Sequence, residues 1–151
     1  MVEQMMDQSV DQAGVFAELV GQEPVVEQLK RAVATSTPAH AWLFTGPPGS
    51  GRSNAARAFA AALNCDVEDP TARGCGACRS CRLVASSSHP SVKLVSTENV
   101  SYRIEDVREL VTTAQDRPQG ARWRVIVVED ADRMTERATN VLLKACLLYT
   151  S

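Results

Sequence analysis

The sequence predicts an α/β fold in which a parallel β-sheet is flanked by helices. Three short, largely apolar runs are typical of strands: Trp42–Thr45, Val92–Val95 and Val125–Val128. Strands of a parallel sheet are buried on both faces, so their sequences are nearly continuous apolar runs instead of an alternation. Helical patterns lie before, between and after these runs, and strands that alternate with helices favour a parallel arrangement.

Four segments carry the spacing or composition of helices. Apolar side chains recur at helical spacing over Val25–Val33, in a helix expected to end near Thr37. Residues Ser53–Leu63 are rich in alanine, the strongest helix former. A third apolar stripe covers Ile104–Ala114, and Thr135 offers an N-cap for a fourth helix.

Composition indicates one globular domain in a chain of 151 residues. The 16 basic and 18 acidic side chains give a net charge of −2, so any contact with DNA would need a local patch or another subunit. Residues 1–14 form a polar, flexible lead without the basic start and apolar stretch of a secretory signal. No apolar run approaches the roughly 18 residues of a membrane span, so a cytoplasmic protein is expected.

A loop of phosphate-binding type lies at residues 46–53, with the sequence Gly-Pro-Pro-Gly-Ser-Gly-Arg-Ser. Its glycines let backbone N–H groups turn toward an anion at the start of a helix. The candidate nucleotide-binding residues are Gly46, Gly49, Gly51, Arg52 and Ser53. Arg52 stands where a working loop has lysine, and a planar guanidinium cannot simply replace a compact ammonium. We expect weak or absent nucleotide binding; the alternative is an ordinary Gly/Pro turn that caps a helix.

An acidic pair, Glu129 and Asp130, follows the third apolar run. In ATPases that have such a phosphate-binding loop, carboxylates in this position lie beside a bound magnesium ion, in the order Asp then Glu. Here the order is reversed, so the candidate base is one methylene shorter. A displacement of about 1 Å can cost about a hundredfold in rate, so no ATP hydrolysis is expected and no residue is assigned as catalytic. Alternatively, the two acids only solvate the end of a strand.

Four cysteines have the spacing of a structural zinc site, C-x9-C-x2-C-x2-C. They are Cys65, Cys75, Cys78 and Cys81. Two-residue gaps suit tight turns that aim sulfur atoms at one tetrahedral ion, and four thiolates leave no open position for a substrate. A redox thiol pair and inert cysteines are the alternatives. His40 and His89 are expected to be ordinary side chains, and Cys146 stands apart from the motif.

The combination of a phosphate loop and a four-cysteine insert resembles the bacterial clamp-loader branch of the AAA+ family. The resemblance covers about Val15 to Ala145. Four stretches carry it: Val15–Gln22, His40–Pro47, Cys75–Cys81 and Ala138–Lys144. It implies a RecA-like parallel sheet flanked by helices, with the zinc module, residues 65–81, inserted in a partial AAA+ domain at 15–145.

Two subunit families of this branch carry all these elements: the ATP-hydrolysing tau/gamma subunit and the non-hydrolysing delta-prime subunit. Arg52 and the Glu129–Asp130 order favour the delta-prime type. The resemblance then implies a non-catalytic subunit of DNA polymerase III holoenzyme, which helps to load the sliding clamp on primer-template DNA together with tau/gamma and delta. A tau/gamma ATPase is the alternative, and a zinc-bearing interaction module unrelated to replication is a second one.

The end of the chain departs from the resemblance. In the family, the helix that corresponds to Ala138–Lys144 is followed by two acidic residues and a proline. Residues 146–151 stand in their place here, so they are expected to be a non-native tail. In the family the strands of the sheet lie in the order 5-1-4-3-2. With Trp42–Thr45 as strand 1 and Val125–Val128 as strand 3, the resemblance implies that strands 4 and 5 are missing from this sequence. We therefore expect a truncated domain that does not fold stably alone.

Overall fold

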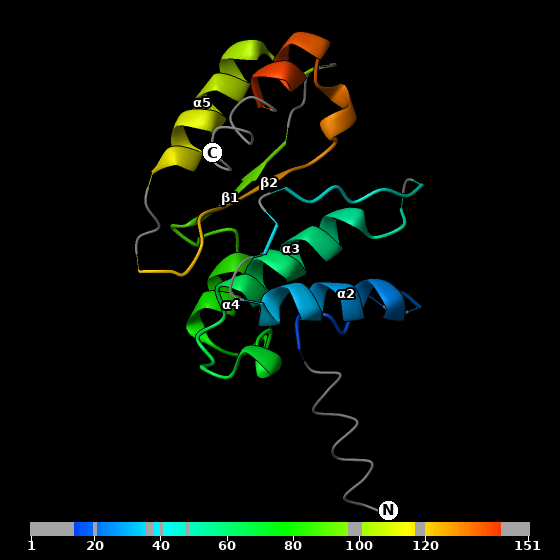
Figure 1. Ribbon diagram of the computed structural model, residues 1–151, viewed down its shortest axis with the longest axis vertical. Helices are drawn as coiled ribbons and strands as arrows, with labels where there is room; N and C mark the ends of the chain where they lie inside the picture. Colours follow the sequence, from blue (N-terminus) through cyan, green and yellow to red (C-terminus); the bar gives the residue numbers. More distant parts are fainter. Residues whose placement is uncertain are drawn as a thin grey trace, which may run out of the picture. The chain divides into compact units, whose positions relative to one another are not determined.

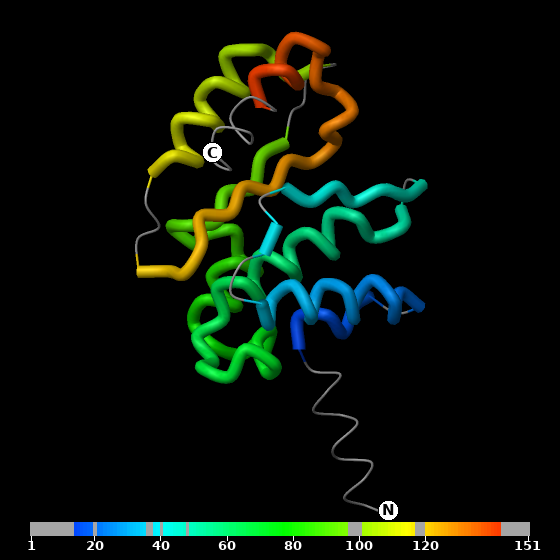
Figure 2. Tube along the Cα trace, in the orientation of Figure 1, coloured from blue at the N-terminus to red at the C-terminus, as the bar shows by residue number. Residues whose placement is uncertain are grey.

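The computed structural model forms two compact units, Met1–Ala39 with Leu43–His89 and His40–Trp42 with Pro90–Ser151 (Figure 1). Figure 2 traces the course of the chain through both units. The structure describes residues 14–19, 21–35, 38–39, 41–47, 49–96, 101–116 and 120–142. The expected tail at 146–151, His40 and Cys146 lie outside these residues, as does the expected lead except Gly14.

The first unit is built around an alanine-rich helix. Its elements are α2 (Glu23–Ala34), α3 (Arg52–Leu63), the 3-10 turn η1 (Pro70–Ala72) and α4 (Arg79–Ala85). Helix α3 packs against both α2 and α4, and it buries most of its side chains, including Phe59. Alanine side chains allow neighbouring helices to approach closely, so α3 forms the core on more than one face. Helix α2 contributes Leu29 and Val33 to the buried interior.

The second unit contains a parallel pair of strands joined by a helical crossover. Strands β1 (Val92–Val95) and β2 (Val125–Val128) pair from Val92 opposite Val125 to Val95 opposite Val128. Parallel strands need a long connection, and α5 (Ile104–Gln115) lies within it. The turn η2 (Ala131–Arg133) and a helix at 136–142 follow β2. The small core of this unit contains Tyr102, Val107 and Ala138.

Several expected elements are confirmed. Both strands coincide with the apolar runs at 92–95 and 125–128, and α2, α3 and α5 lie where helices were predicted. The N–H of Ala138 donates to Oγ1 of Thr135 over 3.2 Å, which confirms the predicted N-cap. The parallel α/β arrangement is therefore present in the second unit. Among the helices described, none is long and apolar enough to cross a membrane.

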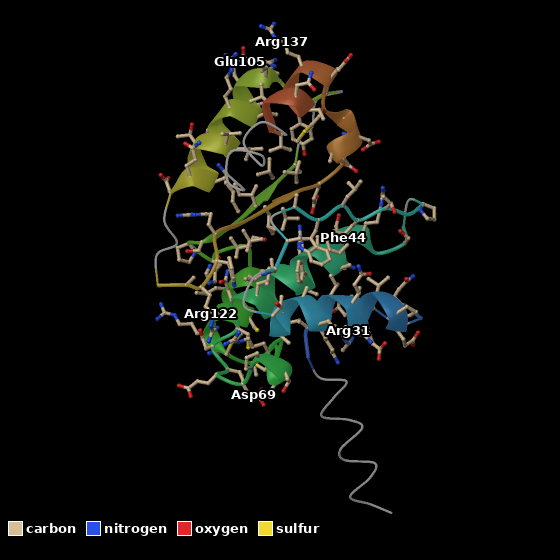
Figure 3. All side chains as sticks on the ribbon, viewed as in Figure 1. Arg31, Phe44, Asp69, Glu105, Arg122 and Arg137 are labelled. Carbon is tan, nitrogen blue, oxygen red and sulfur yellow. The ribbon has the colours of Figure 1, made fainter. Side chains whose placement is uncertain are left out.

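The prediction of a strand at Trp42–Thr45 is wrong. Residues 42–45 do not form a strand: the strands of the described residues are β1 and β2, which pair with each other. Without a neighbouring strand an apolar run cannot join a sheet, and the side chain of Leu43 is 81% exposed. The ring of Phe44, labelled in Figure 3, is tilted against that of Phe59 of α3, with ring centroids 6.4 Å apart. The sheet consequently has two described strands where three were expected.

Leu29 offers a test of the α2–α3 core, because only 2% of its surface is exposed. We expect Leu29→Ala to lower the free energy of unfolding of the full-length protein by about 2–5 kcal/mol, through lost burial and a cavity. The matched control is Leu43→Ala, at the exposed leucine, which should change it by less than about 0.5 kcal/mol. Urea unfolding of both variants measures the difference, and equal effects would contradict this packing.

Candidate metal centre and phosphate loop

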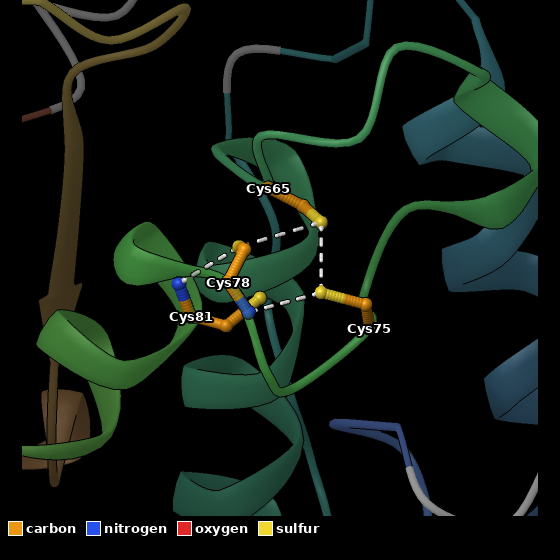
Figure 4. Close-up of side chains that lie close together, drawn as sticks. All are labelled: Cys65, Cys75, Cys78 and Cys81. Carbon is orange, nitrogen blue, oxygen red and sulfur yellow. Dashed lines mark hydrogen bonds between the residues drawn. The ribbon is translucent and has the colours of Figure 1, made fainter. Parts of the chain in front are cut away.

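The four cysteines of the predicted zinc motif come together in the first unit (Figure 4). Their sulfur atoms all lie within 4.8 Å of one another, and the thiols are free of disulfides. Cys65 lies just beyond the end of α3, Cys78 is the N-cap of α4, and Cys81 lies in the first turn of α4. The two-residue gaps thus place one sulfur before the helix and another on it.

Two of the sulfur–sulfur distances match the edge of a tetrahedral metal site. Sγ of Cys65 lies 3.7 Å from Sγ of Cys75 and 3.8 Å from Sγ of Cys78. A tetrahedron with zinc–sulfur bonds of about 2.3 Å has sulfur–sulfur edges of about 3.8 Å. The donor set and its dimensions therefore suit a four-coordinate, structural metal site. Its closed shell of protein ligands is typical of sites that do not bind substrate.

Backbone N–H groups point at the sulfur atoms. Sγ of Cys75 accepts from the N–H groups of Ala77, at 3.4 Å, and Cys78, at 3.3 Å. Sγ of Cys78 accepts from those of Cys81, at 3.4 Å, and Asp66, at 3.5 Å. Hydrogen bonds from N–H groups favour the ionised form of an acid, and the thiolate is the form that binds metal.

The thiols differ in how readily they ionise. Burial opposes ionisation of Cys65, but backbone N–H groups of Cys75, Val67 and Gly74 outweigh it and bring its pKa to about 6. Burial raises the pKa of Cys81, and the nearby Cys65 and Cys78 raise it further. Burial also raises the pKa of Cys78. Four ionised thiols at this spacing repel one another, so the fully ionised cluster needs a cation.

Gly74 allows the cysteine module to pack closely on the rest of the first unit. Its φ is +100°, and a Cβ here would lie 3.1 Å from Cγ2 of Val15 and 3.4 Å from Cβ of Ala62. The carbonyl of Gly74 also accepts a hydrogen bond of 2.9 Å from the N–H of Val15. At position 74, a residue larger than glycine would have a strained backbone and would press against Val15.

The predicted phosphate loop leads directly into α3. Gly49 and Gly51 have φ values of +81° and +88°, which favour glycine, and Gly51 is the N-cap of α3. No side chain caps this helix and no acidic residue lies in its first turn, so its positive end is not neutralised locally. Oγ of Ser50 is buried and has no hydrogen-bond partner among the described atoms. Arg52 begins the helix, where phosphate loops have lysine.

The acidic pair lies in the second unit, where β2 ends. The N–H of Glu129 donates to the carbonyl of Val95 over 2.8 Å, and Asp130 adopts the left-handed conformation with φ of +51°. Aspartate tolerates this conformation better than most residues. The hydroxyl of Tyr102 donates to the carbonyl of Glu129, and burial followed by the charges of Asp130 and Glu129 raises the pKa of Tyr102.

The predicted metal ligands form one cluster, whereas the predicted nucleotide-site residues are divided between the two units. The structure brings all four cysteines into one cluster. It places Gly46, Gly49 and Gly51 in the loop before α3, and Arg52 and Ser53 in the first turn of that helix. That loop belongs to the first unit, whereas Glu129 and Asp130 belong to the second. His89 is buried in the first unit, and burial lowers its pKa.

The sequence did not predict the hydrogen bonds of two side chains at these sites. Asp66 bonds to Ser80 of α4, and Tyr102 bonds to the end of β2. Their partners are 14 and 27 residues away along the chain. Only a pattern linking such distant positions could have indicated them, and a single sequence does not provide one.

Known proteins resemble most of this chain. DNA polymerase III subunit gamma/tau of Mycobacterium tuberculosis is 40% identical over 130 residues, which cover 85% of this chain and 22% of that protein. DNA polymerase III subunit tau of Escherichia coli is 33% identical over 130 residues, 85% of this chain and 20% of that protein. Protein STICHEL-like 1 of Arabidopsis thaliana is 35% identical over 135 residues, 85% of this chain and 12% of that protein.

These relatives alter the subunit type expected from the sequence. The polymerase subunits among them are named gamma/tau or tau, so they favour the tau/gamma type over the delta-prime type expected from Arg52, Glu129 and Asp130. The chain spans about a fifth of the length of these curated polymerase relatives.

The family described as DNA polymerase III, delta subunit, matches residues 21–146, which include the phosphate loop, the four cysteines and the acidic pair. This match extends over most of the chain and over both compact units. The chain belongs to this family, and with it to the clamp-loader proteins of DNA replication.

Proposed function

We propose that this chain is part of a clamp-loader subunit of DNA polymerase III, of the tau/gamma type that its relatives represent. One observation carries the proposal: α3 starts at a phosphate-type loop and ends at a four-thiol cluster. Its partners would be the other clamp-loader subunits, the sliding clamp and primer-template DNA, and its compartment the cytoplasm. The contribution of this part is a framework for subunit packing, since its cysteine site has no open position for substrate.

The metal of the four-thiol cluster is proposed to be zinc. Four thiolate ligands and sulfur–sulfur spacings of 3.7 and 3.8 Å match the softness and tetrahedral preference of this ion. When bound, the ion would neutralise the mutual repulsion of the thiolates. Cys65, Cys75, Cys78 and Cys81 would hold it, and the module between α3 and α4 would gain stability from it.

The nucleotide site is proposed to have lost hydrolysis. The positive φ values of Gly49 and Gly51 support an anion-binding loop, but Arg52 starts α3 in place of lysine. The acids after β2 are Glu129 and then Asp130, and Asp130 carries the shorter side chain where a longer base is needed. The loop can still bind an anion through N–H groups, whereas bound ATP with magnesium would lack its usual lysine and base.

A second candidate is a delta-prime subunit, which is non-hydrolysing by nature. The same residues favour it: Arg52, Glu129 and Asp130. The two candidates differ in ancestry more than in the chemistry of this domain. Reconstitution of a clamp loader from purified full-length subunits separates them, because only a tau/gamma-type protein should replace the tau/gamma subunit in assembly.

We expect one zinc ion per chain in the full-length protein, bound by the four cysteines. Cys78→Ser should release the ion, because binding to such thiolate sites is worth on the order of 10 kcal/mol at neutral pH. Cys146→Ser is the matched control and should leave the metal content unchanged, since Cys146 stands outside the motif. Elemental analysis measures both, and a wild-type protein without zinc would overturn the metal assignment.

We expect no ATP turnover by the full-length protein, and weak nucleotide affinity, because of Arg52, Glu129 and Asp130. The combined variant Arg52→Lys, Glu129→Asp and Asp130→Glu should gain measurable nucleotide affinity. Arg31→Lys, the same type of change at the exposed Arg31 of α2 (Figure 3), is the control and should gain none. Phosphate release and binding of a fluorescent ATP analogue are the measurements. Turnover by the unmodified protein would show instead that it is an active motor.

A further inference from the structure

The four cysteines of the cluster are unequally easy to bring together. Cys75, Cys78 and Cys81 lie within one turn and the start of α4, so local structure sets their positions. Cys65 follows α3 and is separated from Cys75 by nine residues. Closing a flexible loop of that length has an entropic cost. Packing of α3 on α4 brings the end of α3 toward the other three cysteines, and a contact beside Cys65 would fix its position further.

Asp66, the residue after Cys65, makes the connection to α4. Its Oδ1 accepts from Oγ of Ser80 over 2.7 Å, and its Oδ2 accepts from the N–H of Ser80 over 3.3 Å. Its own N–H donates to Sγ of Cys78 over 3.5 Å. Ser80 immediately precedes Cys81. The Asp66–Ser80 pair thus joins the two parts of the cluster within one residue of a ligand on each side.

The carboxylate is well placed for this role because Ser80 lies in the first turn of α4. The N–H groups of a first turn have no partner within the helix, and a carboxylate there satisfies one of them. Two hydrogen bonds from one serine also fix the orientation of the Asp66 side chain. A single neutral acceptor could not make the same pair of contacts with equal strength.

A second contact closes the spacer between Cys65 and Cys75 from its other end. Arg73 donates from Nε to the carbonyl of Val67 over 3.1 Å and from an Nη to that of Glu68 over 3.2 Å. The spacer is therefore folded back on itself, so that its start and end lie together. Arg73 orders the loop, whereas Asp66 connects that loop to the helix that carries Cys81.

The charge of Asp66 does not favour the ionised thiols of the cluster. A carboxylate beside four thiolates adds a like charge, which disfavours their ionisation. Its two oxygens accept hydrogen bonds from Ser80, and four sulfur atoms already complete a tetrahedral set. The charge of Asp66 acts on His89, whose pKa it raises against the effect of burial, and its contacts at the cysteine cluster are the hydrogen bonds given above.

We propose that Asp66 is a positioning residue for the metal centre. Its hydrogen bonds to Ser80 hold the sulfur atom of Cys65 close to those of Cys75, Cys78 and Cys81. This proposal rests on the proposed zinc site and extends it to the residues that organise it. Groups that orient metal ligands in this way typically alter metal affinity by 10–100-fold when they are changed.

The test is zinc affinity of the full-length protein, measured by competition with a chromophoric chelator. Asp66→Ala removes both acceptors and should weaken zinc binding by about 10–100-fold. Asp66→Asn keeps one acceptor and should have a smaller effect, as should Ser80→Ala, which keeps the N–H donor. The control is Asp69→Asn, at a carboxylate in the same spacer that accepts from Thr71 (Figure 3). It should retain wild-type affinity.

Cobalt(II) substitution supplies a readout that separates positioning from unfolding. The saturated Asp66→Ala variant should keep the absorption of a four-thiolate cobalt site, because all four ligands remain. Wild-type zinc affinity in Asp66→Ala would overturn the proposal, as would tighter binding in Asp66→Asn, which would show that charge dominates. If Asp66→Ala loses the four-thiolate spectrum, the milder Ser80→Ala decides, and unchanged affinity there would overturn the proposal. A wild-type protein that binds no zinc would instead refute the metal site itself.

Discussion

The first unit depends on the convergence of four thiols around one point. Their sulfur atoms lie within 4.8 Å of one another, an arrangement that ionised thiols adopt only with a cation among them. Three parts of the unit end at this point: the end of α3, the start of α4 and the turn at Cys75. The position of Gly74 against Val15 then fixes the segment before α2 to the same module. A metal ion here would add a further connection between α3 and α4, which already pack against each other.

Helix α3 links this module to the phosphate-type loop. The loop presents the positive end of α3, and the opposite end of the helix leads through Asn64 to Cys65. The alanine side chains between them are buried against α2 and α4, so the helix acts as a rigid connector. Under the function proposed above, this connector would serve subunit packing, and Arg52 in place of lysine would not affect that role.

The sequence predicted those features that depend on local pattern. The runs at Val92–Val95 and Val125–Val128 form strands because each has a parallel partner in the other. The run at Trp42–Thr45 has a similar composition but belongs to neither described strand, so composition alone did not predict its conformation. Helix α4 was missed because it is only seven residues long and its first three residues belong to the cysteine motif. The Asp66–Ser80 and Tyr102–Glu129 bonds join distant positions, and no periodicity signals them.

The central claim is that a single tetrahedral ion with four sulfur ligands organises the first unit. X-ray absorption at the zinc edge of the purified full-length protein tests it most directly, because it reports the number and type of ligand atoms. The account predicts four sulfur atoms at about 2.3 Å and no nitrogen or oxygen in the first coordination shell. A shell with nitrogen or oxygen ligands, or with fewer than four sulfur atoms, would contradict it.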